Sequence, residues 1–68
     1  MQTEEERDLE RIMDSLGMAE LLAAIARIAT EKQDHVASNW QDRALAKRWG
    51  AIAAQLEKLA RNVDDPYA

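Results

Sequence analysis

Apolar residues recur in the C-terminal half of this chain at alternating steps of four and three positions. The row consists of Leu45, Trp49, Ile52, Leu56, Leu59 and Val63. At 3.6 residues per turn, this spacing places all six side chains on one narrow stripe of a single helix. We therefore predict a long helix over residues 40–63, whose stripe must pack against another helix of the same chain or of a second chain.

A second pattern predicts a helix over residues 18–36 with two neighbouring faces. Its broad apolar arc consists of Met18, Leu21, Leu22, Ile25, Ile28, Ala29 and Val36. A stripe of small residues lies beside this arc and consists of Ala19, Ala23, Ala26 and Thr30. The predicted third helix carries a comparable stripe of Ala46, Gly50, Ala53 and Ala60. Because small side chains let two helix backbones approach closely, both stripes are predicted to be surfaces of close contact.

The N-terminal segment predicts a short helix over residues 4–16. Thr3 and Glu6 have the spacing of a capping box, in which each residue satisfies a backbone N–H of the other. One face of this helix carries Leu9, Ile12, Met13 and Leu16. A helix of about a dozen residues is marginal in isolation, so this one must dock to persist.

Two breaks separate the three predicted helices. Gly17 can adopt a positive φ after the first helix, and Asp14 or Ser15 is the predicted cap of the second. A continuous, kinked helix is the alternative at this point. Before the third helix, Ser38 and Gln41 match a second capping box.

Composition makes the fold class all-α. The 68 residues include no Cys, no Phe, two Gly and one Pro, and good helix formers dominate. We predict a single domain that is an antiparallel helical hairpin or three-helix bundle, with a loose tail at 64–68. The second and third helices are expected to face each other through their Leu and Ile seams. The first helix then covers the hairpin, or two hairpins pair. A chain this small buries too little surface to be stable without support, and without Cys it cannot form disulfides. We therefore expect homodimerisation to complete the bundle.

Charge is unevenly distributed over this acidic chain, whose net charge is −4. Acidic residues dominate positions 1–20, and basic residues dominate positions 43–61. These segments are predicted to attract each other within a bundle or between subunits, although exposed ion pairs contribute only about 0–1 kcal/mol each. The apolar stretch 21–29 is short and contains Arg27. We expect no membrane segment and a cytoplasmic protein.

A basic ridge on the third predicted helix suggests one alternative function. Arg43, Lys47, Lys58 and Arg61 align opposite the apolar stripe, and Trp40 lies near the start of the same helix. Basic side chains beside an aromatic ring can bind nucleic acid through phosphate contacts and base stacking. The acidic net charge argues against this function, since nucleic-acid-binding domains are commonly basic.

The string Asp14-Ser15-Leu16, followed by Glu20-Leu21, resembles the attachment motif of acyl carrier proteins. In that family the Ser of such a triplet opens a helix and carries phosphopantetheine. The resemblance implies that Ser15 is the modified residue and that Glu20 and Leu21 lie on the recognition helix. It covers about eight residues, and the segment before the triplet is shorter than in carrier proteins.

Catalytic and metal-binding patterns are sparse. Glu31 and His35, one turn apart, could share a metal ion, but His35 is the only His and thiolate ligands are absent. No nucleophile has a base at a spacing that can be argued, and no glycine-rich loop follows a strand. We predict no cofactor, no metal site and no enzymatic activity.

The predicted function is therefore a small protein–protein interaction module, an accessory or inhibitor protein that self-associates and presents a helical surface to a larger partner. The predicted interface consists of Leu21, Leu22, Ile25, Ile28, Leu45, Trp49, Ile52, Leu56 and Leu59. The predicted contacts with the larger partner are Trp40, Arg43 and Lys47, because exposed Trp and Arg are enriched at binding hot spots.

Overall fold

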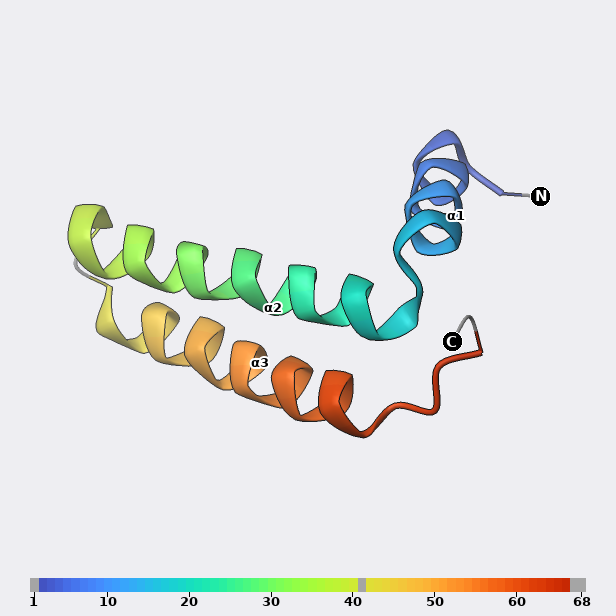
Figure 1. The fold of residues 1–68 in the computed structure, drawn as a ribbon. Helices are drawn as coiled ribbons and strands as arrows, with labels where there is room; N and C mark the ends of the chain where they lie inside the picture. The colour runs from blue at the N-terminus through green and yellow to red at the C-terminus, as the bar shows by residue number, and fades with distance from the viewer. Residues whose placement is uncertain (1, 41, 67–68) are drawn as a thin grey trace.

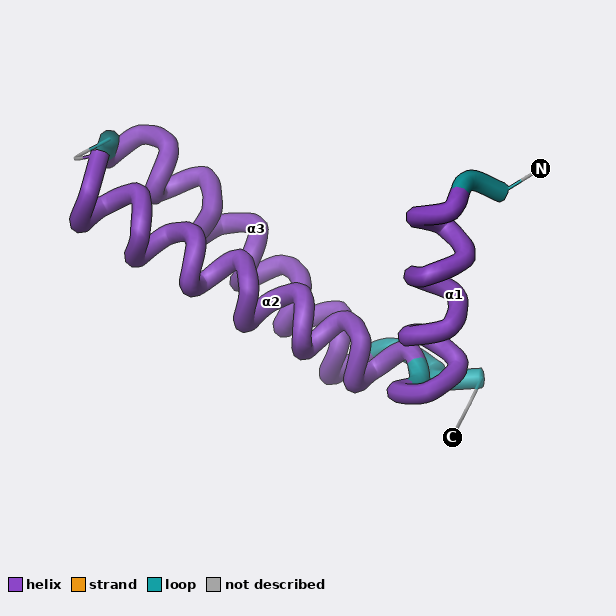
Figure 2. The backbone as a smooth tube through the Cα atoms, turned by 90° about the horizontal axis from the view of Figure 1, so that it is seen from above, coloured by secondary structure: helices purple, strands orange, loops and turns teal. Residues whose placement is uncertain are grey.

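The structure, a computed structural model, describes residues 2–40 and 42–66 and is all-α over this part of the chain, as predicted. The helices α2 and α3 run antiparallel and side by side, and we call this pair the hairpin (Figure 1). The shorter α1 leaves the hairpin at a steep angle where α2 begins (Figure 2). The elements are α1 (Glu4–Leu16), α2 (Met18–His35), a π-helical turn (Val36–Trp40) and α3 (Arg43–Asn62).

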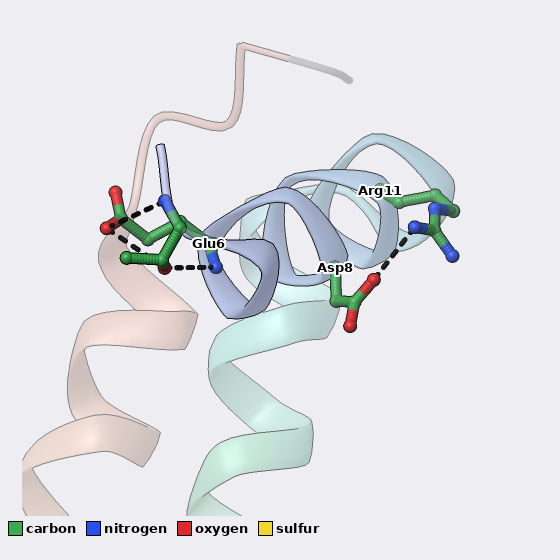
Figure 3. A network of polar contacts seen from close by, with 4 residues as sticks. Glu6, Asp8 and Arg11 are labelled. Carbon is green, nitrogen blue, oxygen red and sulfur yellow. Dashed lines mark hydrogen bonds and ion pairs between the residues drawn. The ribbon is translucent and has the colours of Figure 1, made fainter. Parts of the chain in front are cut away.

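The start of α1 is the predicted capping box. The backbone N–H of Glu6 donates to Oγ1 of Thr3 at 3.1 Å, and the carboxylate of Glu6 accepts from the backbone N–H of Thr3 at 3.5 Å (Figure 3). One turn further on, the guanidinium of Arg11 donates to Asp8 at 2.8 Å. Both partners of this ion pair are exposed, so its contribution to the stability of α1 is small.

Small residues join the two helices of the hairpin. The buried residues of α2, the π-helical turn and α3 are Leu22, Ala26, Ala29, Val36, Ala46 and Ala53. At Gly50, a Cβ atom would lie only 2.7 Å from Nε2 of Gln33, so the side chain of this α2 residue packs directly over Gly50 of α3. The structure contains the predicted close contact at Ala26, Ala46, Gly50 and Ala53.

The expectation that the large apolar stripes of α2 and α3 would face each other is wrong. Ile28 remains 54% exposed and Leu59 51% exposed, while Ala26 is 1% exposed. Alanine and glycine occupy most of the contact, and Leu22 and Val36 are its large buried members. The other large residues lie beside the contact line instead of within it.

The joint between α1 and α2 is closed by a residue from the other end of the chain. Gly17 adopts a φ of 84° and has no side chain with which to cap α2. The carboxylate of Asp65 accepts from the backbone N–H groups of Met18 at 3.2 Å and Ala19 at 2.9 Å instead. A negative charge at this point also suits the positive end of the helix dipole.

The predicted caps of α2 are therefore wrong, while the predicted break at Gly17 is correct. Asp14 and Ser15 lie inside the last turn of α1, and the first backbone N–H groups of α2 donate to Asp65 instead. The positive φ of Gly17 excludes the continuous helix that was the alternative.

The second joint also differs from its prediction. Helical backbone continues from α2 through the π-helical turn, which includes Ser38, so this residue does not cap α3. Asp42 does so by accepting from the backbone N–H of Leu45 at 3.0 Å, and α3 begins at Arg43 instead of Trp40. Gln41, the other half of the predicted cap, and residues 67–68 of the predicted tail lie outside the described residues.

The three helices together form an open L. The radius of gyration is 14.0 Å, whereas a compact domain of this length has about 11 Å. The accessible surface is 5508 Å², compared with about 4,300 Å² for a folded monomer of this mass. The chain thus exposes surface that a closed small domain would bury.

Ala53→Leu should destabilise the hairpin by about 1–3 kcal/mol or more, because Ala53 is 5% exposed and its neighbours leave no room for a larger side chain. Ala54→Leu is the matched control, since Ala54 is exposed on the next position of the same helix. The free energy of unfolding from urea titration at constant protein concentration measures both effects. Equal stability of the two variants would contradict the close helix contact.

Asp65→Ala should lower the free energy of unfolding by about 1 kcal/mol, because two backbone N–H groups at the start of α2 lose their acceptor. The neighbouring Asp64 is exposed and makes no such contact, so Asp64→Ala provides the control. Urea titration of both variants distinguishes a loss of the cap from a general effect of removing charge. An identical change in the two variants would show that Asp65 does not cap α2.

Candidate protein–protein interface

Two rows of large apolar residues flank the contact between α2 and α3. Seen along α2 from its N-terminus, the row on this helix is turned anticlockwise from Ala26 by roughly 100–160°. Seen along α3 from its N-terminus, the row on that helix is turned in the same sense from Ala53, by roughly 40–120°. Because the helices are antiparallel, rotations in the same sense bring both rows to the same side of the hairpin.

We call this side the open apolar face. Its members are Leu21, Ile25 and Ile28 on α2 and Leu45, Trp49, Ile52, Leu56 and Leu59 on α3. None of them is buried: Ile25, Ile28, Ile52 and Leu59 are exposed, and the other four are half-buried. A contiguous row of this size on a small monomer is typical of an interaction site.

Eight of the nine predicted interface residues therefore lie together on one open face. The ninth, Leu22, is buried in the contact between α2 and α3, so it supports the hairpin instead. Trp49, a member of the stripe predicted to pack against another helix, is only half-buried. The structure brings the predicted residues together, but on a surface that one copy of the chain leaves uncovered.

The helix α1 does not cover the open apolar face. It contacts α2 near their joint and makes no contact with α3. Figures 1 and 2 show it rising clear of the hairpin. The helical angles of the apolar rows place them on this same side of the hairpin. Its own row stays exposed as well, with Leu9 at 54% and Ile12 at 45%, and only Met13 is half-buried. The chain thus presents two apolar surfaces at a steep angle to each other.

The opposite side of the hairpin is polar. Arg43, Lys47, Lys58 and Arg61 are all exposed on α3, away from the open apolar face. Acidic Glu57 lies within this ridge, and Asp34 of α2 lies on the same side of the hairpin. These carboxylates reduce the positive charge of the ridge. The side chain of Trp40 lies outside the described part of the chain.

Ser15 is exposed in the last turn of α1, beside Arg11, Ile12 and Leu16. The resemblance to acyl carrier proteins implies a serine that opens a helix. In this structure the next helix opens at Met18, three residues later.

His35 and Glu31 line a shallow hollow with Ile28 and Lys32. Nδ1 of His35 lies 3.1 Å from the side-chain nitrogen of Asn39, which also donates to the carbonyl oxygen of His35 at 3.1 Å. Among residues 2–40 and 42–66, no group of three acidic, His or Cys side chains is arranged to hold a metal ion. None of the helices in that part of the chain has the length and apolar character needed to cross a membrane.

No protein-family model matches this chain, and it is not similar to any curated protein or solved structure with which it was compared. A functional proposal must accordingly be argued from the geometry of the open apolar face and the charges around it.

Proposed function

We propose that this protein acts in the cytoplasm as a small, non-enzymatic interaction module, an accessory or inhibitor protein. Two copies pair through their open apolar faces and present their outer surfaces to a larger protein. The observation that carries this proposal is the row of eight large apolar side chains along one side of the hairpin, none of them buried.

The exposed area suits a stable dimer. The accessible surface of 5508 Å² exceeds the value for a closed monomer of this mass by about 1,200 Å². Specific protein–protein interfaces bury about 1,200–2,000 Å² in total over both partners. A second copy that covered this excess on each side would therefore form an interface of at least the standard size.

The shape of the open apolar face favours a second copy of the same chain as its occupant. Its residues follow the four-and-three spacing with which helices interdigitate in bundles. A two-fold axis that lies in the plane of the contact brings two hairpins together as four helices, and each copy then contributes the same surface. Each hairpin then covers the open apolar face of the other, and the apolar rows of both copies are removed from water.

The larger partner would meet the surfaces that remain outside such a dimer. Arg43 and Lys47 are exposed on the polar side of the hairpin, and Trp40 belongs to the turn next to them. Arg and Trp are the residue types most enriched at binding hot spots. The acidic Glu57 within the ridge and the net charge of −4 favour a protein partner over nucleic acid.

Ile52→Glu should dissociate the dimer, because it places one unpaired carboxylate of each copy within an apolar contact. Sedimentation equilibrium over a wide concentration range should give twice the chain mass of 7.7 kDa for the unaltered protein. For Ile52→Glu we expect the dimer Kd to rise at least about a hundredfold, which corresponds to about 2.7 kcal/mol.

Ala51→Glu provides the matched control for this variant. Ala51 is exposed on the neighbouring position of α3, turned away from the open apolar face, so the same new charge should leave the dimer intact. A chain mass of 7.7 kDa at every concentration would refute self-association. Equal dimer Kd values for Ile52→Glu and Ala51→Glu would assign the contact to another surface.

A further inference from the structure

Acidic residues border the apolar row of α1 on both sides. Glu5, Glu6, Asp8 and Glu10 lie near Leu9 and Ile12 around the helix, and all four are exposed. Figure 3 shows Glu6 and Asp8 on opposite sides of α1. Arg7 lies on the far side of this helix, whereas Arg11 lies beside Ile12 and pairs with Asp8 at 2.8 Å. We call the four acidic residues the acidic margin of α1.

The open apolar face of the hairpin has a basic border at one end. Lys32 continues the row of Ile25 and Ile28 by one more turn of α2. Arg48 lies beside Trp49 on the same end of α3. Both cations are exposed, and both lie near the π-helical turn that links the two helices. Glu31 also lies beside Ile28 and Lys32, so the two cations outnumber the acidic residues at this end of the face.

The acidic margin cannot reach these cations within one copy. Lys32 is fourteen residues beyond the start of α2, which corresponds to about 21 Å along the helix axis. α1 stands at the opposite end of the hairpin and extends away from it (Figure 2). The two charged borders, each next to an apolar row, are therefore separated by the length of the hairpin.

We propose that the two copies pair antiparallel about a two-fold axis, and that α1 of each copy packs over the linker end of its partner's hairpin. Leu9 and Ile12 then extend the apolar contact, and the acidic margin lies beside Lys32 and Arg48 of the second copy. This inference rests on the proposed self-association and adds its orientation and the role of α1.

Antiparallel pairing places the acidic margin of each copy beside Lys32 and Arg48 of the other. A two-fold axis that lies in the contact plane and runs perpendicular to the helices carries the open end of one hairpin to the linker end of the other, so the charge contact occurs twice. Parallel pairing would place Lys32 and Arg48 close to the same residues of the second copy. Complementary charges at the border of an interface determine the orientation of the two copies more than they increase affinity. Like charges placed together disfavour the alternative orientation.

Charge reversal tests this arrangement in the full chain. Glu5→Lys with Glu10→Lys retains the Thr3–Glu6 cap and the Asp8–Arg11 ion pair, and it should raise the dimer Kd about tenfold at low salt. Adding Lys32→Glu and Arg48→Glu should restore the Kd to within about threefold of the unaltered protein. A defect confined to the folding of α1 would not be restored by changes in α2 and α3.

Asp34→Lys with Glu57→Lys is the matched control, since it makes the same change of net charge on the polar side of the hairpin. We expect this pair to leave the Kd within about threefold of the unaltered protein. A control that weakens the dimer as much as Glu5→Lys with Glu10→Lys would overturn the inference, because net charge alone would then explain the effect.

Disulfide cross-linking gives an independent readout, because the chain contains no Cys of its own. Glu6→Cys and Arg48→Cys chains, mixed under oxidising conditions, should form mainly the mixed dimer. Cross-linking of Arg48→Cys only to itself would establish parallel pairing and overturn the inference.

If Ile52→Glu dissociates the dimer while charge reversal has no effect, self-association stands and the role of α1 fails. A monomeric unaltered protein refutes both.

Discussion

The close contact between α2 and α3 determines the rest of the structure. Gly50 admits the side chain of Gln33 at a distance that a Cβ atom would not allow, and Ala53 lies buried one turn further on. Small side chains form most of this contact, which leaves room for few large ones beyond Leu22 and Val36. The other large apolar residues are consequently displaced to one side of the hairpin. The same small residues that join the helices thus also create the open apolar face.

The position of α1 depends on a second constraint at the other end of the hairpin. The positive φ of Gly17 turns the chain between α1 and α2, and Asp65 holds the first backbone N–H groups of α2. The tail after α3 thereby ties the start of α2 to the end of the hairpin. This junction leaves α1 on the side of the open apolar face, where its own apolar row has nothing to pack against within one copy.

Periodicity in the sequence was sufficient to predict the helices and the set of residues on the open apolar face. It could not predict how the helices face each other. A helical pattern gives the angle of each side chain around its own axis, and hydrophobicity alone favours contact through Ile28 and Leu59. The observed contact follows instead from the close approach at Gly50, a property of two helices together that depends on side-chain volume.

The capping of α2 shows a different limit of sequence reasoning. Asp14 and Ser15 had the local spacing of a cap, but the turn at Gly17 keeps them inside α1. The acceptor that replaces them, Asp65, is separated from Ala19 by 46 positions in the chain. Local spacing carries no information about such a pair. The Asp64-Asp65-Pro66 segment indicated only that α3 ends there.

A contact made of alanines also limits how stable one copy can be. Burial of apolar surface contributes about 25 cal/mol per Å², and alanine offers little of it compared with isoleucine or leucine. A small chain that uses its alanines for the hairpin and leaves Ile28, Ile52 and Leu59 exposed gives up much of its available stabilisation. In the proposed dimer these residues leave water, and α1 gains a surface on which to dock. Folding of the chain and its association then form one coupled equilibrium, in which the stability of each copy rises with the concentration of the other.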